Sequence, residues 1–233
     1  GSFALSGIML PLFLDDWIAI TDSDAAFLRI GLVVLVVGLL CVGILVRGIS
    51  FFQRIKETNS TVSKRIFTDK PFLILSVIFF LLCFTGLAVV SQAAAMGAAA
   101  GIAAAGLATT SLTIGYLTGS LLGASIAQRI GELWVILLMS VLSFFGVMAM
   151  LSEAQLLMFA GSAFIGLTFG GVGSVFPMLI GLRYGSENIS RLYGRMIFAY
   201  GFAGLIAPSA AGVLFEIWKS YSPALLLCAI LTL

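Results

Sequence analysis

Histidine is absent from this sequence of 233 residues, and charged residues make up only 9% of it. Without histidine the chain lacks the commonest general base and metal ligand. Soluble domains carry about 25% charged residues, whereas 61% of this chain is hydrophobic. The net charge of +2 is too small to indicate a polyanionic partner. The composition therefore excludes an ordinary soluble domain, a disordered chain and a nucleic-acid-binding protein, and it predicts an all-α polytopic membrane protein.

Cysteine is also scarce. Cys41, Cys83 and Cys228 each lie in an apolar run, and their spacing is not that of metal ligands. We expect buried thiols that form neither a disulfide framework nor a metal site. An enzyme would need a catalytic cluster at the membrane boundary, and the adjacent Asp15 and Asp16 are better explained as a solvated loop. The sequence therefore predicts no enzyme activity, no catalytic residues, no metal and no cofactor.

Long apolar runs alternate with polar segments along the chain. A helix needs about 20 apolar residues to cross a bilayer. Four runs have this length: 27–46, 133–151, 156–182 and 196–215. The uncharged stretch from Pro71 to Gln128 would be about 87 Å long as one helix, so we expect two helices that turn between Ser91 and Ala100. Residues 1–14 and 223–233 are too short to span, and we interpret them as partial helices.

The basic residues gather in alternate loops. Of the 12 lysines and arginines, all but Arg29 and Lys219 lie in every second loop along the chain. Those two lie in the loops between. Since lysine and arginine favour the cytoplasmic side, we expect residues 48–70 to form a cytoplasmic linker of a protein in the inner or plasma membrane. The linker would contact anionic membrane lipid, or it would be an ordinary cytoplasmic loop with the usual excess of basic residues.

This linker divides the chain into three predicted parts. Residues 1–47 would be the remnant of an N-terminal helical half. Residues 48–70 are the basic linker. Residues 71–233 would form a six-helix C-terminal half whose last helix is cut.

Glycine is common, with 26 residues, and it recurs at helical spacing. Gly115, Gly119 and Gly123 form a GxxxGxxxG pattern, and small residues four apart let helix backbones approach closely in lipid. Pro177 and Pro208 lie inside apolar runs, where proline often marks moving or cavity-lining segments. We expect further packing positions at Gly170, Gly171, Gly201, Gly204 and Pro208.

Polar side chains are few within the apolar runs. Thr109, Thr113, Tyr116 and Ser120 fall on one helix face. They would line an aqueous cavity, or their hydroxyls would bond back to their own helix. Tyr200 would be a substrate donor or an interfacial anchor. We take Thr109, Thr113, Tyr116 and Tyr200 as candidate substrate-binding residues.

No charged residue lies deep inside a complete apolar run. Ionisable residues within the membrane usually mark ion or proton coupling. Their absence leaves three possibilities open: coupling residues lie outside this sequence, the substrate is neutral or apolar, or the protein is not a coupled transporter.

A short basic loop joins the second and third helices of the six-helix block. It reads ASIAQRIGE at residues 124–132 and resembles the G-x-L-A-D-R-x-G-R loop motif of the major facilitator superfamily. The alanine, the arginine and the second glycine are kept, while the first glycine, the aspartate and the final basic residue are replaced. The resemblance implies two six-helix halves, with Gln128, Arg129 and Gly131 at a cytoplasmic gate.

The last third of the chain resembles one branch of that superfamily, the oxalate/formate antiporters and monocarboxylate transporters. The similarity rests on these residues: Phe169, Gly170, Gly171, Pro177, Arg183, Tyr184, Gly185, Tyr193, Gly194, Gly201, Gly204, Pro208 and Gly212. In the exchangers a lysine directly before a glycine binds the anion, and Tyr200 stands at the matching position. They also carry an arginine in the helix before the short loop, and here no arginine occurs from Pro71 to Gln128.

With both cations missing, a dicarboxylate such as oxalate would be hard to hold. The resemblance implies a secondary active transporter that moves a small organic solute, such as a monocarboxylate, by alternating access. Its partners would be that solute, with or without a coupling proton or ion. Two alternatives stay open: an efflux-type transporter of neutral or amphipathic compounds, and a membrane fragment that does not transport.

Overall fold

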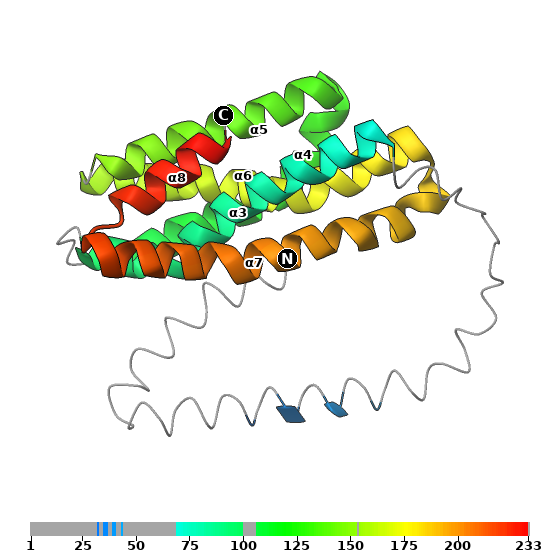
Figure 1. Cartoon of the computed structure of the whole chain (residues 1–233). Helices are drawn as coiled ribbons and strands as arrows, with labels where there is room; N and C mark the ends of the chain where they lie inside the picture. The colour runs from blue at the N-terminus through cyan, green and yellow to red at the C-terminus, as the bar shows by residue number, and fades with distance from the viewer. Residues whose placement is uncertain are drawn as a thin grey trace. The chain divides into compact units, whose positions relative to one another are not determined.

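The computed structural model describes residues 69–99, 106–152 and 154–232, together with six helical residues between Leu32 and Gly43. The predictions for residues 1–47 and 48–70 lie almost entirely outside these residues. The long helices belong to one compact unit, which alone is described below. Its elements, coloured in chain order in Figure 1, are α3 (Lys70–Ala99), α4 (Gly106–Ile130), α5 (Glu132–Leu151), α6 (Gln155–Tyr184), the short helix η2 (Ser186–Asn188), α7 (Ile189–Trp218) and α8 (Ser222–Thr232).

These elements confirm an all-α polytopic membrane fold, because the described residues form helices and no strand. Within the described ranges, four segments are long and apolar enough to cross a membrane: Lys70–Ala99, Leu133–Leu151, Gln155–Tyr184 and Ser186–Trp218. α4 has 25 residues, but its many glycine, serine and threonine residues make it less apolar than these four.

Two helix boundaries can be compared with the sequence-based expectation. α3 ends at Ala99, at the far end of the range from Ser91 to Ala100 in which the turn was expected. The alanines that follow Gln92 favour helix more than any other residue, so they prolong α3. α7 begins at Ile189, two turns before the apolar run at Met196. Hydropathy identifies only the part of a helix that lies in lipid. The polar residues at the start of α7 continue the helix beyond that part.

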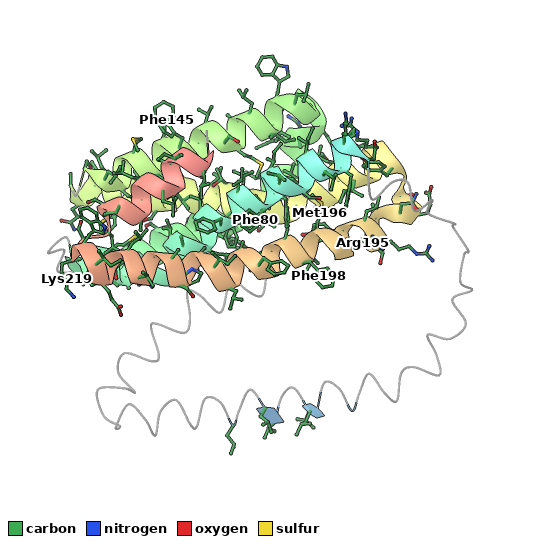
Figure 2. All side chains as sticks on the ribbon, in the orientation of Figure 1. Phe80, Phe145, Arg195, Met196, Phe198 and Lys219 are labelled. Carbon is green, nitrogen blue, oxygen red and sulfur yellow. The ribbon has the colours of Figure 1, made fainter. Side chains whose placement is uncertain are left out.

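α6 is the central helix of this unit. In its most apolar stretch 61% of the residues are buried, against 17% in α7. α6 packs against α3, α4 and α5, while α7 lies mainly on α3 and α8 lies along α5 (Figure 1). α7 therefore has two faces: Met196 is 1% exposed and Phe198 is 71% exposed, pointing away from the other helices (Figure 2).

Glycine brings α4 and α6 into backbone contact. A Cβ atom on Gly115 would overlap the carbonyl oxygen of Ala163, and one on Gly119 would overlap that of Leu167. The reverse also holds, because a Cβ on Gly170 of α6 would overlap the carbonyl oxygen of Tyr116. Side chains larger than hydrogen at these positions would separate the helices.

The remaining predicted packing positions differ among themselves. A Cβ on Gly123 would lie 2.7 Å from the Ser174 hydroxyl, and one on Gly171 would lie 3.1 Å from Cε of Met139. On α7, by contrast, a Cβ on Gly201 would have no neighbour within 4 Å, and one on Gly204 would make only an ordinary contact with Leu87. Within the described unit, the glycine face of α7 therefore does not hold two helices close together, and the half-buried Pro208 lies along the same helix.

Candidate functional site

Four helices line a half-open cavity of about 240 Å³. Its lining comes from α3, α4, α6 and α7: Phe79, Cys83, Tyr116, Phe169, Val172, Gly173, Tyr193, Ile197 and Tyr200. Cys83, Tyr116, Phe169 and Tyr200 each lie close to the midpoint of their own helix. A cavity at this depth suits a solute on its way across a membrane. Its volume lies below the roughly 300–1,000 Å³ of pockets for drug-sized ligands.

Aromatic rings form much of the cavity wall. The ring centroid of Phe169 lies 5.5 Å from that of Tyr116 and 6.3 Å from that of Tyr200, with the Phe169 and Tyr200 planes within 9° of parallel. On the α3 side, Phe79 meets Tyr193 edge to face at 6.1 Å. Aromatic pairs favour these distances. Phe169 therefore links a tyrosine of α4 to a tyrosine of α7.

Glycines fix the position of Phe169. A Cβ on Gly86 of α3 would overlap the Phe169 ring, so only glycine leaves room for the ring there. On the other side, the Gly170 contact with the Tyr116 backbone holds α4 against α6 beside that ring. The close helix packing thus sets the spacing of the aromatic wall.

The structure brings together two of the four predicted substrate-binding residues. Tyr116 and Tyr200 both line the cavity, while Thr109 and Thr113 do not. The Thr113 hydroxyl donates to the carbonyl oxygen of Thr109 at 2.7 Å, and that of Ser120 donates to Leu117 at 2.9 Å. These two hydroxyls therefore bond back to their own helix. This was one of the two arrangements expected for the polar face of α4, the other being an aqueous cavity wall.

Other cavity residues are absent from the sequence-based prediction. Tyr193 lies seven residues before Tyr200. Residues seven apart lie on the same face of a helix, so the spacing also predicts that Tyr193 shares a face with Tyr200. Phe79 and Cys83 are four residues apart on α3 and share a face in the same way. For Gly173 no local signal exists beyond Pro177, four residues later.

The cavity wall carries no charge among the described residues that form it. Its lining residues with polar side chains are three tyrosines and Cys83. No cluster of three or more His, Cys, Asp or Glu residues in the described part of the chain could hold a metal ion. Such a wall offers hydrogen bonds and aromatic contact, and it disfavours a solute with two charges, because each desolvated charge would need a partner.

The predicted gate residues lie at one end of this unit, remote from the cavity. Gln128 and Arg129 are exposed in the last turn of α4. Gly131 joins α4 to α5 with φ 90°, a conformation that favours glycine, and its N–H donates to the Ala127 carbonyl at 3.0 Å. Arg129 stands about 20 Å along α4 from Tyr116. The gate role itself stays a prediction.

No model of a known protein family matches the chain. The chain is similar to the uncharacterized MFS-type transporter YhjX of Escherichia coli strain K12, with 25% identity over 163 residues. The match covers 66% of this chain and 40% of that protein, so the chain spans well under half of its relative's length. This similarity supports the resemblance to the major facilitator superfamily, while the oxalate/formate and monocarboxylate branch stays a prediction.

Proposed function

We propose that this chain forms the solute-binding part of a secondary active transporter, which moves a small monocarboxylate across the membrane by alternating access. The observation that carries the proposal is the cavity near the helix midpoints, with phenol hydroxyls and aromatic rings drawn from four helices. The similarity to a transporter of the major facilitator type supports the same class.

The chemistry of the wall supports one carboxyl group rather than two. Tyrosine hydroxyls donate hydrogen bonds to carboxyl oxygens, and Tyr193 and Tyr200 of α7 line the cavity beside Tyr116 of α4. No arginine or lysine lines the cavity to hold a second negative charge. The apolar side chains Phe79, Val172 and Ile197 suit a short hydrocarbon tail.

A neutral or amphipathic compound is the second candidate solute. The specific observation in its favour is the uncharged wall, which would bind a neutral molecule without the cost of desolvating an ion. Competition between acids, amides and alcohols of equal length separates the two candidates, because a monocarboxylate site prefers the acid.

Uptake into proteoliposomes that contain the full-length protein tests the proposal. We expect uptake of labelled short monocarboxylates and about fivefold weaker apparent affinity in Tyr200→Phe, since a hydrogen bond contributes about 1 kcal/mol. Tyr221→Phe is the matched control, because Tyr221 lies at the α7–α8 corner, where its hydroxyl donates to Gln92 at 3.2 Å. Equal affinity in Tyr200→Phe and wild type would remove Tyr200 from the site.

A further inference from the structure

Nothing in the described part of the chain requires glycine at position 173. Gly173 lies in the interior of α6, and it is not one of the described glycines with positive φ, which are Gly131 and Gly185. A Cβ atom at Gly173 would have no neighbour within 4 Å, whereas one on Gly170 would overlap the carbonyl oxygen of Tyr116. Glycine in a helix interior is destabilising relative to alanine. Within the described unit, glycine at this position therefore has a reason other than backbone conformation or helix packing.

The cavity supplies such a reason, because Gly173 lines it between two aromatic positions of the same helix face. Phe169, Gly173 and Phe176 follow one another at spacings of four and three residues, so they share one face of α6. Phe169 is 5% exposed and Phe176 is 0% exposed, whereas Gly173 is exposed and belongs to the cavity lining. On this face α6 thus carries only a hydrogen atom at the position between two large rings.

The rings on either side of Gly173 belong to two separate aromatic layers. In the first layer, the ring centroid of Phe169 lies 6.3 Å from that of Tyr200. The second layer joins one ring each from α3, α6 and α7: Phe79, Phe176 and Tyr193. The centroid distances from the α3 ring to the other two are 5.0 and 6.1 Å. Seven residues of helix separate the two layers on α6, which corresponds to about 10 Å along the helix axis.

The gap between the two layers has an apolar wall on α7. Ile197 lies four residues after Tyr193 and three residues before Tyr200, so it stands between the layers on α7 as Gly173 does on α6. Both Ile197 and Gly173 line the cavity. A hydrocarbon side chain makes no hydrogen bond, and burial of apolar surface against it is favourable. The gap therefore suits the hydrocarbon part of a solute.

We propose that Gly173 determines the size of the solute, because the hydrocarbon part of the solute occupies the space beside Gly173 between the two aromatic layers. This inference rests on the proposed function and adds to it a selection by chain length. A side chain at position 173 would fill the space that the solute needs, so it would exclude longer chains before shorter ones. Glycine thus favours solutes with a hydrocarbon tail of a few carbon atoms over acetate.

Two homologous series, measured on the purified full-length protein in detergent, test the proposal. The carboxylates are acetate, propionate and butyrate, and the amides are acetamide, propionamide and butyramide. The Kd of each compound is measured from the rise of the thermal unfolding midpoint with its concentration. The variants are Gly173→Ala and Gly173→Leu. Gly212→Ala is the matched control, since a Cβ there also meets no neighbour within 4 Å and Gly212 does not line the cavity.

In the wild type we expect about fourfold tighter binding for each added methylene group, which is the gain that its burial provides. Gly173→Ala should weaken butyrate binding by at least about fivefold, because the added methyl group overpacks the gap around the longest chain. Gly173→Leu should weaken propionate binding as well, while acetate should bind to both variants as it binds to the wild type. Without a ligand, the unfolding midpoint of Gly173→Ala should not fall, since the new methyl group meets no other atom.

The ratio of butyrate to acetate affinity separates this role of Gly173 from a purely structural one. A wild-type ratio in Gly173→Leu, or equal weakening of all chain lengths in Gly173→Ala, would overturn the inference while the proposed function stands. If only the amides bind and their length dependence changes in the variants, the monocarboxylate function is wrong and the inference stands. The absence of binding by both series in the wild type would overturn both.

Discussion

At the scale of single residues, the site depends on where glycine is, as much as on where tyrosine is. Gly86 leaves room for the Phe169 ring, and that ring lies between Tyr116 and Tyr200. Gly173 also lines the cavity, and a Cβ there would have no neighbour within 4 Å. In each case the missing Cβ sets the shape of the wall, and the aromatic side chains supply its chemistry.

Gly86→Ala tests this dependence. The added Cβ would overlap the Phe169 ring, which must then leave its near-parallel arrangement with Tyr200. Aromatic pairs contribute about 0.5–1.5 kcal/mol, so we expect two- to tenfold weaker apparent affinity for a short monocarboxylate, measured by uptake into proteoliposomes. Gly204→Ala is the control, because its Cβ would make only an ordinary contact with Leu87. Equal losses in the two variants would contradict this role of Gly86.

The residues also show what the sequence can and cannot predict about the site. A polar side chain in an apolar run identifies Tyr116 and Tyr200, and both line the cavity. The same argument also selects Thr113, whose hydroxyl bonds to its own helix. Periodicity gives the face of a helix, but the rotation of that face toward its neighbours depends on tertiary packing. Hydropathy likewise predicts the helical membrane fold from the number and length of the apolar runs.

At the scale of helices, α4 and α6 form the tightest pair. The glycine pattern of α4 predicts close packing in general, but not the partner helix. The structure assigns α6 as this partner through overlaps that a Cβ would cause at both helix backbones. The glycines of α7 follow a similar pattern in the sequence, yet Gly201 and Gly212 have no neighbour within 4 Å. Spacing alone therefore does not distinguish the two helices.

Gly119→Ala should weaken the α4–α6 pair. The new methyl group would overlap the carbonyl oxygen of Leu167, so the backbones must separate. Overpacking of this kind costs about 1–3 kcal/mol, which a lower thermal unfolding midpoint in detergent would report. Gly212→Ala on α7 meets open space and should be neutral or stabilise by about 0.4–1 kcal/mol. A Gly119→Ala protein as stable as the wild type would contradict the contact.

At the scale of the whole molecule, the two ends of α7 should lie on opposite sides of the membrane. The helical segment Ser186–Trp218 is long enough to cross it. Arg183, Arg191 and Arg195 gather near its beginning, and Lys219 is the single basic residue near its end. Because positive charge favours the cytoplasmic side, we expect the beginning of α7 to lie in the cytoplasm.

Labelling of single cysteines tests this orientation. In a protein whose native cysteines are replaced by alanine, Glu187→Cys should react with an impermeant maleimide in inside-out vesicles. Lys219→Cys should react in intact cells. The reverse pattern would contradict the orientation, and labelling of both positions from one side would show that α7 does not span.

The backbone contact between α4 and α6 also has an entropic consequence. Most helix pairs must freeze rotamers of long side chains when they associate, and each frozen side chain costs up to about 2 kcal/mol. Gly115, Gly119 and Gly170 have no side chain to freeze at this contact. The pair therefore associates at little cost in side-chain entropy, and we expect it to assemble first, before the other cavity helices pack against it.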